Sequence, residues 1–271
     1  EMTNFANWYT YYRTRMQMMK TSASFAFGTL SNQYRVGYFS INNNTGSDFL
    51  NLNKFETTHK QNWFTKLTAA RPNNATPLRG ALTRMWRLFG GRLNGTTLNG
   101  STVVDPMQYS CQQNFTLLST DGYWNESSNP NPAKQLDGTT DIGDADGSLP
   151  RPLLDGTNTS NTLADVAAYY YETDLRLTGS SYCTSSTGGD LCTNNVPVGG
   201  VDQATHQHMT TFTLGLGVSG YMLFDENYRT ATNGDFFDVA NGTPANPTNG
   251  VCTWQTSGAC NWPIPVNNSP P

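Results

Sequence analysis

Residues 115–125 of this chain read FTLLSTDGYWN and decide its fold. The first six residues are mostly strand formers, and the Asp-Gly pair that follows is typical of a turn. We therefore predict a buried strand that presents the carboxylate of Asp121 at its carboxyl end. A second string, TPLR at 76–79, predicts the start of a helix, with Thr76 as the capping residue before Pro77.

Strand and helix patterns alternate along the rest of the chain. Apolar spacings of three and four predict helices over 5–27, 59–70, 77–89 and 162–175, and strand formers predict strands over 34–41, 115–120 and 209–218. The aromatic stripe of the first helix is expected to face the core. The alternation favours an α/β fold, with an open, mostly parallel sheet and helices on both faces. In such folds, ligands bind at the carboxyl ends of the strands, where Asp121 lies.

Three polar stretches interrupt this pattern. We expect residues 1–224 to form one domain, with insertions at about 90–110, 126–161 and 179–205. Periodicity fades after residue 224. Residues 225–271 are therefore predicted to be an irregular tail that contains a disulfide and leads through a proline-rich end into a further domain.

Composition limits the function. The chain has 271 residues, of which 36% are hydrophobic, which is enough for a core, and only 13% are charged. A net charge of −4 argues against nucleic-acid binding, because phosphates need a basic face. No apolar run is long enough to predict a transmembrane segment, and the first residues lack the pattern of a signal peptide. The chain is expected to be a mature, trimmed or recombinant form of an exported protein.

The five cysteines indicate an oxidising compartment. Cys183 and Cys192, and likewise Cys252 and Cys260, are close pairs in Gly/Ser/Thr-rich sequence where a local disulfide would staple a loop. Free thiols or a four-cysteine zinc site are the alternatives, although these spacings are wider than those of usual zinc-ligand pairs. Cys111 is left without a partner in the chain, so its partner is expected elsewhere.

Thr76 and Asp121 together suggest part of a metal site. A hydroxyl and a carboxylate from adjacent loops can meet at one hard cation, and all-oxygen donors favour Mg²⁺ or Ca²⁺. Taken singly, Thr-Pro is an ordinary helix start and Asp-Gly an ordinary turn. On a strand and helix framework, however, the pair resembles the von Willebrand factor A-type domain. That family's metal-ion-dependent adhesion site combines a DxSxS loop, a threonine and an aspartate.

The resemblance implies that Thr76 and Asp121 are the second and third parts of this adhesion site. No DxSxS string occurs in the chain, and the family places that string on the strand before the first helix. The first strand is therefore expected to be missing from the chain and supplied by a separate segment or by another chain. A sheet without that strand would expose two unpaired edges and part of the core.

Four longer strings narrow the resemblance to PilY-type pilus proteins. They are NFANWYTYYRTR at 4–15, CQQNFTLLSTDGYWN at 111–125, TLADVAAYYY at 162–171 and HQHMTTFTLGLG at 206–217. Proteins of this family are bacterial type IV pilus biogenesis factors and adhesins, in which an A-type domain precedes a C-terminal β-propeller. The resemblance implies export through the periplasm to the pilus tip. Its implied partners are minor pilins or the tip complex, and host or abiotic surfaces.

Two further groups of residues could hold a cation. Asp144-Ala-Asp146-Gly-Ser resembles the opening of a calcium loop, although no glutamate closes it at the spacing of an EF-hand, and a solvated acidic loop is the alternative. His206 and His208 could recruit a transition metal from one side of a strand. The remaining histidine, His59, is far away in sequence, so a structural role is favoured.

An enzymatic function is disfavoured, because the chain has no Gly-x-Ser-x-Gly string, no His-Glu-x-x-His string and no evident Cys-His arrangement. The sequence thus predicts a non-enzymatic adhesion or assembly module that binds surfaces or minor pilins, with a divalent-ion site. The alternative is a metal-independent structural component that primes pilus assembly.

Overall fold

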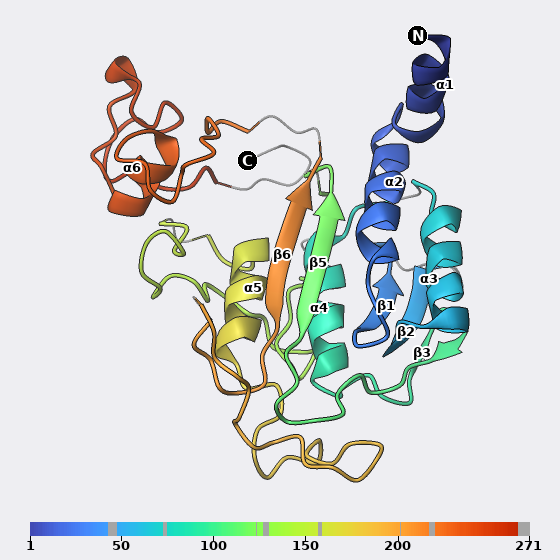
Figure 1. The fold of residues 1–271 in the computed structure, drawn as a ribbon. Coiled ribbons are helices and arrows are strands. Elements are labelled where there is room, and N and C mark those ends of the chain that lie inside the picture. The colour runs from blue at the N-terminus through green and yellow to red at the C-terminus, as the bar shows by residue number, and fades with distance from the viewer. Residues whose placement is uncertain are drawn as a thin grey trace.

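The computed structural model describes residues 1–42, 48–72, 75–122, 124–126, 130–156, 159–200, 202–216 and 220–264 (Figure 1). Its helices are α1 (Met2–Tyr11), α2 (Arg15–Gly28), α3 (Thr57–Ala69), α4 (Leu78–Phe89), α5 (Leu163–Glu172) and α6 (Asp235–Asn241), with a 3₁₀ turn at Pro247–Asn249. Its strands are β1 (Arg35–Phe39), β2 (Phe49–Lys54), β3 (Thr97–Leu98), β4 (Ser101–Thr102), β5 (Phe115–Thr120) and β6 (Thr210–Gly215). Within these ranges, every helix is too short or too polar to cross a membrane.

The strands pair into three two-stranded sheets. β5 and β6 are parallel, whereas β1 with β2 and β3 with β4 are antiparallel. The prediction of one open, mostly parallel sheet therefore differs from the structure. The physical reason is that β1 and β5 are not hydrogen-bonded to each other in the described part of the chain, so the two larger pairs stay separate. The mixed helix and strand content agrees with the predicted α/β class.

The main core lies around α4 and α5, which flank the β5–β6 pair (Figure 1). Leu82, Trp86 and Phe89 of α4 pack with Val166 and Tyr170 of α5. The Trp86 and Tyr170 rings lie 5.0 Å apart between centroids. α4 also buries Leu78, Ala81 and Leu88, whereas Met85 is half-buried. These contacts fix the helix that starts at the TPLR string.

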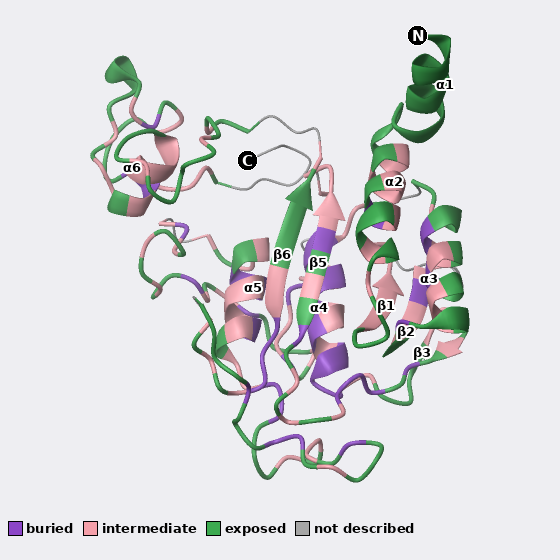
Figure 2. Ribbon diagram, in the orientation of Figure 1, coloured by how far each residue is buried: buried purple, intermediate pink, exposed green. Residues whose placement is uncertain are grey.

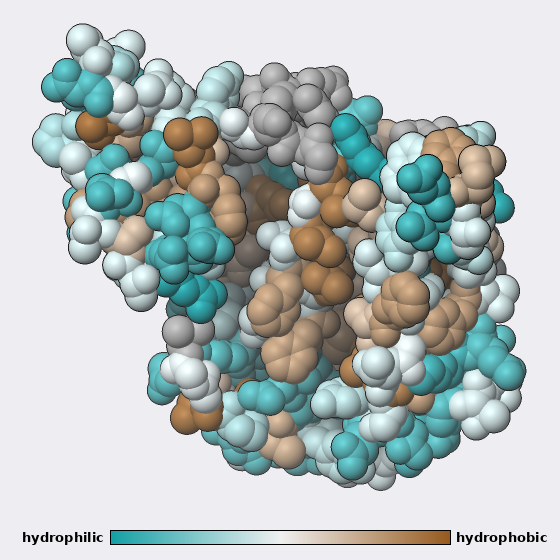
Figure 3. Space-filling view, turned by 45° about the horizontal axis from the view of Figure 1, so that its top comes forward, coloured by the Kyte–Doolittle hydropathy of each residue, from teal (hydrophilic) through white to brown (hydrophobic). Residues whose placement is uncertain are grey.

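The opposite side of the β5–β6 pair is open to solvent. Phe115 of β5 is 57% exposed and Phe212 of β6 is 53% exposed, with Leu117 and Leu214 exposed beside them (Figure 2). A strip of apolar surface accordingly runs through the middle of the face seen in Figure 3. The prediction of a buried strand at 115–120 therefore holds for Leu118 but not for Phe115 and Leu117. β6 is exposed from Phe212 to Gly215, although parallel strands are usually covered on both faces.

The N-terminal segment forms two helices, not the single helix predicted over 5–27. Thr14 has extended backbone geometry, and a reciprocal capping box with Gln17 starts α2 there. None of the residues of α1 is buried, so its aromatic stripe does not face the core as expected. α1 projects from the body beyond α2, where the described chain offers it no other helix or sheet to pack on (Figure 1).

Three smaller apolar clusters accompany the main core in the described residues, and one of them joins Phe49 of β2 to Leu88 of α4 and Val103. Ala23 of α2 packs with Phe55, Trp63 and Leu67 near β1 and β2. At the C-terminal end, Val239 of α6 packs on Cys252 and Cys260. The tail predicted to be irregular thus contains a helix, because a short apolar cluster of its own stabilises α6. The proposed division at residue 224 stays a prediction.

The structure contains the two disulfides predicted from the sequence, Cys183–Cys192 and Cys252–Cys260. The alternative of a four-cysteine zinc site therefore does not apply. Cys111 is a free, exposed thiol. The insertion at 179–205 is also held by buried Arg176, which pairs with Asp105 at 2.6 Å and donates to a backbone carbonyl of this insertion.

Candidate functional site at the carboxyl end of strand β5

The two strings singled out in the sequence meet in space. β5 ends at Thr120, and the chain continues through Asp121 toward Asn125, which lies against Thr76. The Asn125 backbone N–H donates to the Thr76 carbonyl at 3.2 Å, and the Thr76 N–H donates to the Asn125 side-chain oxygen. The loop after β5 is therefore fastened to the loop that leads into α4, as predicted for two adjacent loops.

Thr76 does not cap α4 in the predicted way. The N-cap residue is Pro77, whose ring has no atom that can accept a hydrogen bond from the N–H groups of the helix. The carboxylate of Glu126 takes this role from the neighbouring loop, accepting the N–H of Arg79 at 3.2 Å and the N–H of Gly80 at 2.8 Å. A negative charge at this end of a helix is stabilised by the free N–H groups and the helix dipole.

An ion pair buried beside this cap locks the two loops together. The guanidinium of Arg79 lies 2.7 Å from Glu126, with side chains that are only 10% and 2% exposed. The same guanidinium lies over the Trp124 ring, 4.4 Å from its centroid, and donates to the Asn161 carbonyl at 2.9 Å. The sequence interpretation missed Glu126, although it directly follows the string that ends at Asn125.

Asp121 remains at the surface. Its carboxylate pairs with Arg15 of α2 at 3.0 Å, with the two side chains about half exposed. Thr76 and Asp121 alone do not fit a divalent cation, because they supply two oxygen donors where a hard cation needs six or more, and Asp121 already has a cationic partner. Among the described residues, Asp121 belongs to no group of three potential metal ligands. The metal site predicted here stays a prediction.

The predicted calcium loop lies in a different environment. Asp144 is exposed, Asp146 is buried, and both carboxylates approach that of Asp165 in the first turn of α5. Burial, reinforced by the charges of Asp165 and then Asp155, raises the pKa of Asp146 to about 7. Asp165 also forms a capping box with Thr162 that starts α5. Its approach to the loop comes from the tertiary fold.

The two histidines near β6 are held by the protein. The His206 ring nitrogen lies 2.9 Å from the Tyr171 carbonyl, and the His208 ring contacts the His206 carbonyl at 2.8 Å and Asp202 at 3.0 Å. These bonds use both nitrogens of His208, which agrees with the structural role favoured from the sequence.

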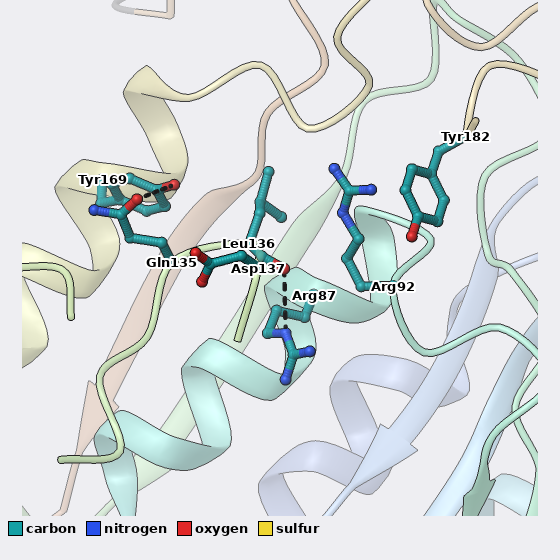
Figure 4. Close-up of a pocket in the computed structure, with 7 residues that line it drawn as sticks. All are labelled: Arg87, Arg92, Gln135, Leu136, Asp137, Tyr169 and Tyr182. Carbon is teal, nitrogen blue, oxygen red and sulfur yellow. Dashed lines mark hydrogen bonds between the residues drawn. The ribbon is translucent and has the colours of Figure 1, made fainter. Parts of the chain in front are cut away.

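Another hollow opens beside α4 and α5 (Figure 4). It is lined by Arg87, Arg92, Gln135, Leu136, Asp137, Tyr169 and Tyr182. The Arg92 guanidinium lies over the Tyr182 ring at 3.7 Å from its centroid, and hydrogen bonds to Thr139 and Thr140 lower the pKa of Asp137. None of the seven is a serine, cysteine or histidine, so the lining offers no nucleophile paired with a base.

Comparison with known proteins identifies the relatives of the chain. It is 32% identical to the type IV pilus biogenesis factor PilY1 of Pseudomonas aeruginosa PAO1 over an alignment of 280 positions, gaps included, which covers 88% of this chain and 22% of that protein. PilY1 of strain PAK is 31% identical with the same 22% coverage. The chain is a PilY1-type type IV pilus sequence. It spans about a fifth of the length of these PilY1 relatives.

No family model matches this PilY1-type chain, and no solved structure matches it significantly. The PilY-type resemblance of the four strings is confirmed by the relatives. The von Willebrand A-type architecture stays a prediction.

Proposed function

We propose that this chain is a non-enzymatic adhesion and assembly module of a bacterial type IV pilus, located outside the cell at the pilus tip. Its contact surface is the carboxyl end of β5, where Asp121 and Arg15 lie at the surface. The proposal rests on the PilY1 relatives, which are named biogenesis factors, and on the geometry of this surface. Its partners are minor pilins, and host or abiotic surfaces.

The observation that carries the proposal is that a partly exposed carboxylate lies beside a segment that a buried ion pair holds in place. The buried pair of Arg79 and Glu126 fastens the first turn of α4 to the segment after β5, and Asp121 in that segment has a side chain that is 40% exposed and paired with Arg15. Binding residues are commonly found on loops that a rigid scaffold positions. A partner that offers a cationic or hydrogen-bonding group can compete for Asp121 at little cost, because exposed ion pairs are worth at most about 1 kcal/mol.

The divalent-ion form of this proposal places Mg²⁺ or Ca²⁺ at Asp121 with help from Thr76. The ion would need additional oxygen donors and would have to displace the Arg15 guanidinium. Binding of the ion would then leave a coordination position for an acidic group of the partner.

The exposed apolar strip favours the second candidate, a metal-independent role in pilus assembly. Phe115, Leu117, Phe212 and Leu214 form a contiguous apolar face on β5 and β6, and the two phenylalanine rings lie 6.1 Å apart. Large exposed apolar patches are typical of protein interaction sites. In this role, the module binds other pilus proteins through this face, and the ion is not needed.

A pair of variants in the full-length protein, expressed in its own bacterium, separates the two roles. Asp121→Ala is expected to leave the number of surface pili unchanged and to lower attachment of the cells to surfaces. Phe212→Ser is expected to lower the number of pili. Normal attachment of the Asp121→Ala strain would refute the contact role of this surface, and fewer pili in that strain would assign Asp121 to assembly.

A further inference from the structure

Three carboxylates converge at the junction of the insertion at 126–161 with α5. Asp144, Asp146 and Asp165 each place one oxygen within 4.8 Å of those of the other two. The first two lie on one turn of the insertion, and the third lies in the first turn of the helix. Like charges at this spacing repel one another in a partly buried setting, so such a group needs either a proton or a cation.

Asp146 is the unusual member of this group. It is 1% exposed, and neither of its carboxylate oxygens has a hydrogen-bond partner of normal geometry. Leaving a buried carboxylate unsatisfied is costly, and buried charges are normally paired or coordinate a metal. In addition, Asp155 is buried close enough for its charge to disfavour ionisation of Asp146. No basic residue is among the groups that act on Asp146 electrostatically.

Asp165 holds the turn in place. One of its oxygens accepts the backbone N–H groups of Ala145 and Asp146 at 2.7 and 3.3 Å, and the other accepts the N–H and hydroxyl of Thr162 at 2.7 and 2.9 Å. Asp165 is therefore held in one orientation by four hydrogen bonds, with one of its oxygens close to the carboxylates of Asp144 and Asp146.

Gly147 makes room for the outer carboxylate. A Cβ atom at this position would lie 2.5 and 2.8 Å from the two carboxylate oxygens of Asp144, so a side chain here would force that carboxylate to move. Asp144 is also the exposed member of the group, so it forms the entrance from solvent to Asp146.

We propose that Asp144, Asp146 and Asp165 form a Ca²⁺ site that joins the insertion to α5. All donors are carboxylate oxygens, and the group contains no histidine or cysteine, which disfavours zinc and other transition metals. Ca²⁺ accepts carboxylates in irregular geometry, whereas Mg²⁺ demands a near-octahedral shell and gives up its waters reluctantly. A buried ligand such as Asp146 therefore suits Ca²⁺ better.

The proposed calcium site is linked to the surface at the end of β5 by hydrogen bonds. The Asn161 N–H donates to the Gly143 carbonyl at 2.8 Å, and the Gly143 N–H donates to the Asn161 side-chain oxygen at 2.9 Å. The Asn161 carbonyl in turn accepts a hydrogen bond from the Arg79 guanidinium. Ordering of the turn at Asp144 by an ion therefore supports the position of Arg79, and through it the pair with Glu126. The site itself does not depend on the proposed adhesive function.

The test uses calorimetry of the chelator-treated chain with Ca²⁺ and, in parallel, Mg²⁺. One Ca²⁺ is expected to bind and to raise the thermal unfolding midpoint, and Asp146→Asn and Asp144→Asn are each expected to weaken binding at least tenfold. Asp141→Asn, which changes an exposed carboxylate of the same insertion, is the matched control and is expected to bind as the unaltered chain does. Asp121→Ala is likewise expected to retain the ion.

Asparagine is nearly isosteric with a protonated aspartate, so Asp146→Asn is expected to fold, which circular dichroism checks. Asp144→Asn at the exposed entrance keeps the test decisive if the buried variant does not fold. The proposal is overturned if the unaltered chain binds no Ca²⁺ at millimolar concentration, or if it prefers Mg²⁺. It is also overturned if Asp144→Asn binds as tightly as Asp141→Asn, or if Asp121→Ala abolishes binding.

Discussion

Removal of the Glu126 carboxylate is expected to destabilise the whole chain. In Glu126→Ala, the buried Arg79 guanidinium loses its anion, and the N–H groups of Arg79 and Gly80 lose their acceptor. Breaking a buried ion pair by removing one partner costs about 3–5 kcal/mol. Loss of a helix cap costs about 1 kcal/mol. Because Arg79 keeps the Asn161 carbonyl and the Trp124 ring, we expect a combined loss of about 4 kcal/mol.

Urea unfolding followed by circular dichroism measures this loss. With a slope of about 3 kcal/mol per molar urea, the unfolding midpoint should fall by more than about 1 M. The double variant Arg79→Met with Glu126→Ala should recover much of the stability, since it leaves no buried unpaired charge. Asp121→Ala removes the exposed pair with Arg15 and is the control, with an expected loss below about 1 kcal/mol. A Glu126→Ala chain as stable as this control would refute the reasoning.

Three further outcomes are expected. In calorimetry of the full-length protein with Mg²⁺, Mn²⁺ and Ca²⁺, an ion that binds at the end of β5 should no longer bind to the Asp121→Ala variant. Identical isotherms for the unaltered protein and this variant would refute a metal site at Asp121. Replacing Cys183 and Cys192 by serine should lower the free energy of unfolding by about 3 kcal/mol, given the 9-residue separation; unchanged stability under oxidising conditions would contradict this. Burial alone would raise the pKa of Asp202, but hydrogen bonds from the His208 ring and a tyrosine hydroxyl outweigh it and lower that pKa. A carboxyl whose pKa is lower in the folded chain than in the unfolded chain stabilises the fold at pH values above the unfolded-state pKa, and this stabilisation is lost as the pH falls through the folded-state pKa. Asp202→Asn should therefore be less stable than the unaltered chain at pH 7, and the difference should disappear in acid.

Individual helices and strands could be predicted from the sequence because their capping residues and apolar spacing lie within the element itself. The strand at 115–120 has the predicted bounds, and the capping box at Thr162 starts α5 as its spacing indicates. The meeting of the TPLR string with the loop after β5 agrees with the prediction that a hydroxyl and a carboxylate come from adjacent loops. The prediction failed where a cap could come from a distant segment: Glu126, 46 residues from Gly80, takes the place expected for Thr76.

Burial was predicted less well than secondary structure. The aromatic stripe at the N-terminus has the spacing of a core element, yet it faces solvent in the described structure, as do Phe115, Leu117, Phe212 and Leu214 of β5 and β6. Periodicity shows which residues share a face of a helix or strand. Whether another element covers that face depends on how the pairs of strands assemble, and here β1–β2 and β5–β6 remain separate.

The sequence by itself determined the family, the order of helices and strands, and the residue that stands at the end of β5. The tertiary structure decided how the charges are used. Asp121 lies at the surface beside Arg15, Glu126 is buried against Arg79, and Asp146 is buried among other carboxylates. The reason is that a carboxylate's chemistry depends on its solvation and on the groups around it, and these come from segments that are distant in the sequence.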